Sequence, residues 1–351
     1  MAENVRAAIT NERHRWRGFD LVCVDKTSLA LPECPELLKK FGYQKIRNAY
    51  GNVGAELCVA FHAAGRIPFA FSLGKVYTHE KTLLRKLSRR FLPGQLVLID
   101  AGFYAFENFA ALIGRGANFL IPARSAVRPK AIRKLGESDY LAEISHAATK
   151  EKMTVRFIYV YRDGFRRRRL VTSLLDPTLY PAGELADIYH ERWHIETFYR
   201  DFKVTMRGNK WHCRTVDSFK KELIREMILV CLIRLAAGEA ARRKRVSPGR
   251  ISFTRAYAEF KLIFLKIINQ TLVFDIDIEW DKMVITLSKH VIKIKPGRSF
   301  PRDKGEYRKK TRTLRTGKVG RPRKAPSPER QKKPGRPEEL KNLKGTSCLL
   351  S

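Results

Sequence analysis

The chain is short of cysteine pairs, long apolar runs and acidic residues, and each shortage excludes a class of protein. Its six cysteines are scattered with no C-x-x-C pair, so the spacing of a cysteine-bound zinc site is absent. No stretch reaches about 18 uncharged apolar residues, and the polar residues 1–17 hold no apolar core of a secretory signal. We therefore expect a cytoplasmic protein with reduced thiols and no membrane span.

Acidic residues are only half as common as basic ones. Lysine and arginine number 70 against 35 aspartates and glutamates, which gives the 351-residue chain a net charge of +35. Such an excess repels itself in a compact state unless a polyanion neutralises it, and nucleic acid is the usual polyanion. A membrane-surface or ribosomal protein would carry the same excess, so charge favours nucleic acid without deciding the question. A hydrophobic content of 44% allows a sizeable core and excludes general disorder.

Two apolar runs predict buried strands that each lead to an aspartate. Residues 19–31 read as a strand that ends near Asp25, and residues 96–99 (LVLI) form a fully buried type that stops at Asp100. Residues 56–74 predict a hairpin. If the two strands are neighbours, their carboxylates converge and repel by roughly 1–4 kcal/mol at 4 Å, which favours a cation or a shared proton between them. Taken alone, each aspartate is more typical of a simple turn.

The second half of the chain changes from strand-like to helical patterns. Residues 125–180 are rich in β-forming side chains and predict a β insertion. A helix over residues 181–203 follows, since proline suits a first helical turn. Apolar spacing predicts further helices over 216–243 and 251–268, whereas residues 271–294 contain alternating, strand-like runs.

The helix over residues 181–203 places four polar side chains in one stripe. These are Tyr189, Arg192, Glu196 and Lys203. At about 100° per residue they fall within roughly 60°, beside an apolar stripe that would dock on the sheet, so they border a cleft. The residues expected on the far, solvent-facing side are His190, His194, Thr197 and Asp201. Glu191 falls on the apolar face, and the sequence offers no physical account of it.

Two aspartates and this glutamate suit two-metal chemistry. They supply the hard oxygen ligands that two Mg²⁺ ions about 3.5–4 Å apart require, one ion activating the nucleophile and the other stabilising the leaving oxygen. Arg192 as a fork and Lys203 as a point charge suit flanking phosphate oxygens, with Tyr189 beside them. The alternative is a solvated helix face with an Arg192–Glu196 pair worth a few tenths of a kcal/mol.

The spacing Y-x₂-R-x₃-E-x₆-K over residues 189–203 resembles the signature of bacterial insertion-sequence transposases of the IS-four family. Asp25-Lys-Thr and Asp100-Ala-Gly-Phe are similar to the family's D-G-T and D-R-G-F segments, with Lys26 in place of glycine and Ala101 in place of arginine. The resemblance covers about residues 19–260. It implies an α/β fold: a ribonuclease-H-like mixed sheet flanked by helices, with the β insertion before the catalytic helix.

The resemblance also implies a DDE transposase that cuts the ends of a mobile element and transfers the strands by 3′-hydroxyl attack. Asp25, Asp100 and Glu196 would be catalytic and bind two Mg²⁺ ions, with Mn²⁺ as a substitute. The residues implied to bind DNA phosphate are Tyr189, Arg192 and Lys203. The expected partner is double-stranded DNA, bound by a homodimer at the bacterial nucleoid.

Family members carry an end-binding segment before the first aspartate. Only 24 residues precede Asp25, so we expect that segment to be missing. Two alternatives therefore stay open beside the transposase. One is an inactive, transposase-derived DNA-binding protein, and the other is a ribonuclease-H-like nuclease that cuts without strand transfer.

The last 56 residues, 296–351, predict a basic disordered tail. They hold 18 lysines and arginines against 5 aspartates and glutamates, a net charge of +13. The tail follows a short segment, 1–18, and a catalytic domain, 19–295.

Two Gly-Arg-Pro runs resemble AT-hook cores that lie in a narrow minor groove, although sequence-independent affinity is the simpler interpretation. The tail residues expected to contact DNA are Arg321, Arg323, Lys324 and Arg336. The last four residues also match a prenylation C-a-a-X box, which chance readily produces.

Overall fold

A computed structural model describes residues 14–46, 49–124, 127, 129–161, 168–206, 210–269 and 275–293. The chain divides into one compact unit of residues 1–301 and a second unit of residues 302–351, and only the first contains described residues. The predicted tail contacts Arg321, Arg323, Lys324 and Arg336 lie outside the described residues.

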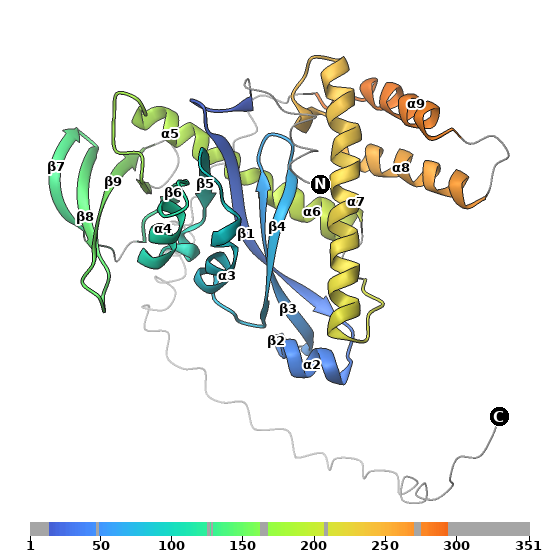
Figure 1. The fold of residues 1–351 in the computed structure, drawn as a ribbon, viewed down its shortest axis with the longest axis horizontal. Helices are drawn as coiled ribbons and strands as arrows, with labels where there is room; N and C mark the ends of the chain where they lie inside the picture. Colours follow the sequence, from blue (N-terminus) through green and yellow to red (C-terminus); the bar gives the residue numbers. More distant parts are fainter. Residues whose placement is uncertain are drawn as a thin grey trace, which may run out of the picture. The chain divides into compact units, whose positions relative to one another are not determined.

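A ten-stranded mixed sheet forms the framework of the first unit (Figure 1). Its strands are β1 (Asp20–Leu31), β2 (Tyr43–Ile46), β3 (Ala49–His62), β4 (Ile67–Lys75), β5 (Gln95–Ile99), β6 (Asn118–Pro122), β7 (Lys130–Gly136), β8 (Asp139–Ser145), β9 (Lys152–Val160) and β10 (Arg168–Thr172). They lie in the order β2-β3-β1-β5-β6-β10-β9-β8-β7, with β4 paired to β3. Strand β1 is antiparallel to β3 and parallel to β5, and β5 is parallel to β6. The predicted α/β class, a mixed sheet flanked by helices, is confirmed.

Helices cover both faces of this sheet. The α-helices are α2 (Pro35–Phe41), α3 (Glu80–Leu87), α4 (Phe106–Ile113), α5 (Ala182–Tyr189), α6 (His194–Arg200), α7 (Val216–Arg243), α8 (Phe253–Ile268) and α9 (Ile276–Ser288). Helices α3 and α4 pack on one face through a core that includes Val22 and Val24 of β1. Helices α5 to α9 belong to the other core, which includes Cys23. The alternation of neighbouring residues between two cores is that of a strand buried on both sides.

The long helix α7 begins at a sequence-encoded cap. The Thr215 hydroxyl accepts from the backbone N–H of Ser218, and the Ser218 hydroxyl accepts in return from the N–H of Thr215. This reciprocal capping satisfies two N–H groups that the first turn would leave without partners. Ser252 caps α8 in a similar way.

Two local predictions are wrong. Strand β1 continues to Leu31 instead of ending near Asp25, because its whole length pairs with β3. The segment expected to form strands within 271–294 contains the helix α9 instead, which the Asp275 side chain caps by accepting from the N–H groups of Asp277 and Ile278. The α9 residues Met283, Val284 and Leu287 recur at helical spacing and join the core of α7 and α8.

Strands β7 to β10 lie in the range where a β insertion is predicted, and they extend the sheet beyond β6. The domain limits themselves stay predictions. The five cysteines of the described residues form no disulfide. No helix in the described part of the chain is long and apolar enough to cross a membrane.

Candidate active site

Asp25 and Asp100 lie side by side on neighbouring parallel strands. Val24 pairs with Ile99 in the register of β1 and β5, so the next residue of each strand is an aspartate. Side chains alternate across a sheet, and the backbone of Asp100 is still extended. Cys23 and Leu98, two residues before each aspartate, belong to the core beneath α5 and α6. Both carboxylates therefore point to the face that these helices cover.

The helix predicted over residues 181–203 is broken into four pieces. It runs as α5, a 3₁₀ turn over His190–Trp193, α6, and a π turn over Asp201–Thr205. We refer to residues 182–205 as the broken helix. A π turn inserts one residue per turn and is frequent at functional sites. The changes of pitch shift the face that each piece presents, which a uniform 3.6-residue period does not anticipate.

Two tyrosines of the broken helix attach it to the strands beside both aspartates. The buried Tyr189 hydroxyl donates to the carbonyl of Ile99 at 3.2 Å, one residue before Asp100. The Tyr199 hydroxyl donates to the backbone carbonyl of Asp25 at 2.6 Å. Because burial dominates, the pKa of both phenols lies above its usual range, so both remain donors at neutral pH.

Arg192 lies at the centre of the carboxylates. Its Nη1 is 3.7 Å from Oδ2 of Asp25, and its Nη2 is 3.8 Å from Oε1 of Glu196. Burial opposes charge on this guanidinium, yet four neighbours raise its pKa above the usual range. They are Tyr189, Asp100, Asp25 and Glu196. Arg192 thus lies beside Asp25 and Glu196, and Asp100 follows the neighbouring strand closely enough for its charge to act on the same guanidinium.

The pairing of Arg192 is incomplete. Both contacts to carboxylates are longer than a hydrogen bond, and its buried Nε has no partner among the described residues. A buried donor without an acceptor costs about 1–3 kcal/mol. The guanidinium therefore has hydrogen-bonding capacity left for a further acceptor.

The Asp25 carboxyl lies where its negative charge is disfavoured. Burial raises its pKa to about 6, and the charges of Asp100 and Glu80 act in the same direction. The backbone N–H of Lys26, which donates to Oδ1 at 2.7 Å, and the charge of Arg192 oppose the rise. A cation close to these carboxylates would relieve their repulsion.

The donor set fits a divalent metal ion by its chemistry. Asp25, Asp100 and Glu196 offer only carboxylate oxygens, the ligands that Mg²⁺ prefers. No three His, Cys, Asp or Glu side chains in the described ranges lie close enough to hold an ion as they stand. Glu196, whose side chain is 49% exposed, is the member with room to turn towards the two strands.

The other two residues of the predicted stripe are engaged with the sheet. Lys203 donates its ammonium to the Thr27 hydroxyl at 2.5 Å and to the Ser28 carbonyl at 2.7 Å. Burial lowers its pKa, while the charge of Glu56 opposes that change. Tyr189 donates to Ile99 as described above. Their contact with DNA phosphate stays a prediction, and in this structure both stabilise strands next to the aspartates.

Lys26 replaces the glycine of the family pattern without crowding Asp25. Its ammonium lies 3.5 Å from Oε2 of Glu56 and 3.5 Å from the carbonyl of Thr78. Glu56 is buried and also accepts from the Ser28 hydroxyl at 3.0 Å and the Tyr77 N–H at 3.2 Å. The lysine side chain therefore runs along the sheet and joins a local network.

One expectation about the broken helix is wrong, since Asp201 is not in solvent. The structure also supplies the physical account of Glu191 that the sequence does not offer. Asp201, expected in solvent, is buried and accepts from Nη2 of Arg234 at 2.8 Å. Glu191 lies 2.7 Å from Nε2 of His194, whose Nδ1 is 3.0 Å from Nη2 of Arg66. Since arginine only donates, Nδ1 accepts and Nε2 carries the proton that Glu191 receives as a hydrogen bond.

Sequence reasoning did not identify Arg66 or Arg234. Arg66 lies in the turn between β3 and β4, 128 residues before His194, and Arg234 lies within α7. An arginine inside the apolar stripe of a long helix was the available signal, because such a residue needs a buried acid.

A family model described as a transposase DDE domain matches residues 16–232, a range that contains all three carboxylates. The transposase InsG for insertion sequence element IS4 of Escherichia coli (strain K12) is 28% identical over 225 residues, which is 60% of this chain and 49% of that protein. The chain thus spans about half the length of this curated relative. A solved piggyBac transposase synaptic complex with hairpin DNA is similar with a TM-score of 0.39 and 13% identity, covering 87% of this chain and 64% of that one.

Proposed function

The chain belongs to the DDE transposase family, and we propose that it cuts DNA at the ends of a mobile element and joins the freed 3′ ends to target DNA. The observation that supports this proposal is that Arg192 lies between Asp25 and Glu196, while Asp100 follows the strand paired with that of Asp25. Asp25 comes from β1, Asp100 follows β5, and Glu196 belongs to α6. Two adjacent aspartates and a facing glutamate provide the acidic surface on which phosphodiester chemistry depends.

DDE transposases generally use divalent metal ions. Asp25, Asp100 and Glu196 would hold two Mg²⁺ ions, or Mn²⁺ in their place. When bound, the ions supply activation of a water or 3′-hydroxyl nucleophile and stabilisation of the leaving oxygen.

Arg192 is the residue best placed to bind the phosphate that is attacked. Its Nε has no partner in the described residues, and its other nitrogens lie 3.7 and 3.8 Å from carboxylates. A planar guanidinium in this state can turn its N–H groups to the non-bridging oxygens of a phosphate and bind them as a fork. The phosphate is then held between Asp25 and Glu196, where the reacting oxygens must lie.

Tyr189, Tyr199 and Lys203 hold the strands in place. The first two donate to the carbonyls of Ile99 and Asp25, and Lys203 donates to Thr27 and Ser28 just after Asp25. These bonds set the positions of the aspartates relative to the broken helix and therefore relative to Glu196. Precise spacing is required because small misplacements in a catalytic group lower rates strongly.

Double-stranded DNA is the proposed substrate, bound by a homodimer. The net charge of +35 favours a polyanion, and the tail residues Arg321, Arg323, Lys324 and Arg336 would add affinity that does not depend on sequence.

The direct test uses the full chain and a duplex that carries the DNA flanking its coding region. With Mg²⁺ or Mn²⁺ we expect nicked and joined products, separated on denaturing gels. Asp25→Asn, Asp100→Asn and Glu196→Gln should each remove both products. The matched control is Glu184→Gln, which changes an exposed acid of α5 that pairs with Arg17 and should retain activity.

The outcomes separate the three candidate functions. Full activity in all three acidic variants would contradict the assignment of the carboxylates. Metal-dependent nicking without joined product would identify a nuclease. Binding of the duplex without any cleavage would identify a DNA-binding protein that has lost its catalysis.

A further inference from the structure

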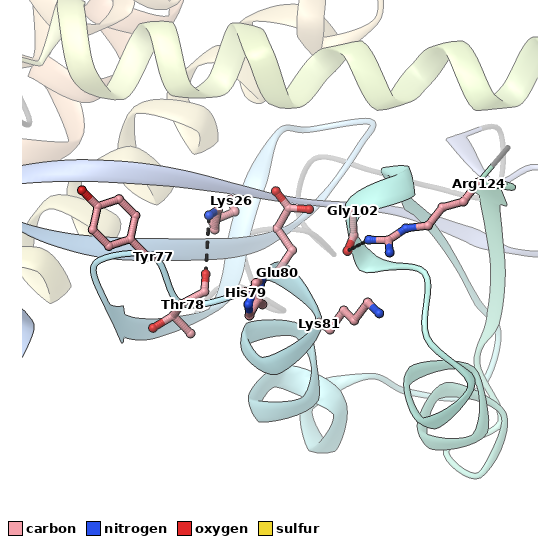
Figure 2. A pocket seen from close by; sticks show the side chains of 8 residues that line it. All are labelled: Lys26, Tyr77, Thr78, His79, Glu80, Lys81, Gly102 and Arg124. Carbon is pink, nitrogen blue, oxygen red and sulfur yellow. Dashed lines mark hydrogen bonds between the residues drawn. The ribbon is translucent and has the colours of Figure 1, made fainter. Parts of the chain in front are cut away.

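A polar hollow of about 170 Å³ lies beside the carboxylates (Figure 2). The residues that line it are Lys26, Tyr77, Thr78, His79, Glu80, Lys81, Gly102 and Arg124. Three of them are cations from separate parts of the chain: Lys26 of β1, Lys81 of α3, and Arg124 after β6. Cations that converge on one hollow repel one another unless an anion lies between them.

Two of the residues that line the hollow follow the aspartates closely in the chain. Lys26 directly follows Asp25, and Gly102 lies two residues after Asp100. Arg124 donates its Nε to the carbonyl of Ala101 at 3.1 Å and its Nη2 to the carbonyl of Gly102 at 3.3 Å. It therefore supplies positive charge next to Ala101, where the family pattern has an arginine. A strand bound at the carboxylates would pass this hollow with an adjacent part of its backbone.

Glu80 is the one carboxylate that lines the hollow, and it is turned to one side. Its Oε2 would lie only 1.3 Å from a Cβ added to Gly102, so any larger residue there would have to displace the Glu80 carboxylate. Figure 2 shows the Glu80 carboxylate between Lys26 and Gly102, directed away from Lys81. Its charge also raises the pKa of Asp25, after the larger effect of burial. Glu80 thus forms the wall towards Asp25 and leaves Lys81 and Arg124 facing the hollow.

The start of α3 adds to the positive potential of this hollow. The helix begins at Glu80, and its N-cap residue His79 makes no side-chain hydrogen bond to the first turn. The N-terminus of a helix favours an anion, although the N–H of Thr82 already donates to the carbonyl of His79 and the first turn contains Glu80. The N-terminus and the side chains of Lys81 and Arg124 act on the same space.

We propose that this hollow binds a backbone phosphate of the DNA strand next to the phosphate that is cut, with Lys81 and Arg124 as its main contacts. The proposal rests on the proposed function only in taking DNA as the substrate. It adds residues outside the Y-R-E-K stripe, and it gives Lys26 and Arg124 a common role in a subsite that follows both aspartates. Such a contact fixes the register of the strand, as phosphate contacts generally do.

The first test measures binding without catalysis. The dissociation constant of the full chain for a short DNA duplex is measured in EDTA over a series of salt concentrations. Lys81→Gln should lower the slope of log K against log salt by about 0.9, the value for one lost phosphate contact. The matched control, Lys220→Gln, removes the same charge from an exposed position of α7 and should leave the slope unchanged. Equal slopes for wild type and Lys81→Gln would overturn the proposal.

The second test locates the phosphate along the strand. A single uncharged methylphosphonate replaces each phosphate of the duplex in turn. At one position the replacement should weaken binding by the wild type and cause no further loss in Lys81→Gln. Additive losses at every position would overturn the subsite. If the coupled position is found and the wild type makes no metal-dependent cut, the proposed function fails while the subsite stands.

Discussion

Charged side chains at the candidate active site form long ion pairs, whereas the buried pair between the broken helix and α7 is short. Arg192 lies 3.7 and 3.8 Å from carboxylates of side chains that are 24% and 49% exposed. Arg234, by contrast, is 2% exposed and donates its Nη2 to Asp201 at 2.8 Å. Each arginine also has a buried Nε without a partner among the described residues, so the two differ in the length of their ion pairs. A second tight pair, between Arg156 and Asp139, lies in the outer part of the sheet.

The difference separates two uses of charge in one fold. A buried charge that loses its partner costs several kcal/mol, so a tight pair fixes the geometry around it. A partly exposed charge with long contacts can exchange partners at little cost. Asp25, Glu196 and Arg192 share the long contacts of the second kind, although the arginine side chain is only 13% exposed. The following predictions, from the largest expected effect to the smallest, test this division.

Asp100→Asn should lower the rate of cleavage by about 10⁴-fold, as expected for a member of a cooperating catalytic set. The free energy of unfolding should change by less than about 1 kcal/mol, because the substitution also removes repulsion from Asp25. Single-turnover cleavage and urea unfolding measure the two effects. Asp187→Asn, at an exposed position of α5, is the control. An Asp100→Asn variant with an unchanged rate would remove this carboxylate from the site.

Asp139→Ala should lower the free energy of unfolding by about 3–5 kcal/mol, because Arg156 is 0% exposed and would lose its only carboxylate contact in the described structure. Cleavage per folded molecule should stay near the wild-type rate. The control on the same strand is Glu143→Ala, which breaks an exposed pair with Lys152 and should cost less than about 1 kcal/mol. Similar losses of unfolding free energy in both variants would contradict the distinction between short, buried ion pairs and long, more exposed ones.

Tyr189→Phe tests a buried residue of the broken helix that also lies beside the candidate active site. Removing the hydrogen bond to the Ile99 carbonyl should cost about 1 kcal/mol of stability. It should also slow cleavage by about tenfold, because Ile99, the residue before Asp100, loses its hydrogen bond from Tyr189. The exposed Tyr161→Phe serves as control. A loss of stability with no change in rate would show that the tyrosine is only structural.

Glu191→Gln should have the smallest effect, and that effect should depend on pH. The hydrogen bond from His194 lowers the pKa of Glu191 below its ordinary value of 4.5. The resulting stability is therefore present above that value and is lost as the pH falls through the lowered pKa. Because Glu191 is partly exposed, we expect about 0.5 kcal/mol at neutral pH. Denaturant unfolding of both proteins measures it, and a difference that persists in acid would contradict the assignment.

Local patterns in the sequence predicted the parts of the fold that depend on short-range order. Apolar periodicity identified the β3–β4 hairpin and the helix α7, whose bounds in the structure are close to those expected. The α9 segment was misjudged because apolar residues alternate there, while burial against α7 and α8 and the Asp275 cap favour a helix. Alternation alone does not reveal whether a neighbouring strand exists to pair with.

The candidate site was also predictable only in the parts that depend on local sequence patterns. The two aspartates were predicted because each interrupts or follows a strongly apolar run, and Glu196 and Arg192 because they share one helical stripe. The inward position of Asp201 was missed, since it depends on a π turn and on Arg234 of another helix. The hollow at Lys81 and Arg124 was also missed, because its walls come from four separate segments.

The sequence by itself determined which residues are candidates for the chemistry and which segments are buried, because side-chain type and apolar spacing act over a few residues. Tertiary structure alone decided which charges are held tightly and which remain free to bind. That distinction depends on burial and on partners from other elements, 17 residues away for Arg156 and 33 residues away for Arg234. The cost of an unpaired charge exists only once a fold has removed the surrounding water.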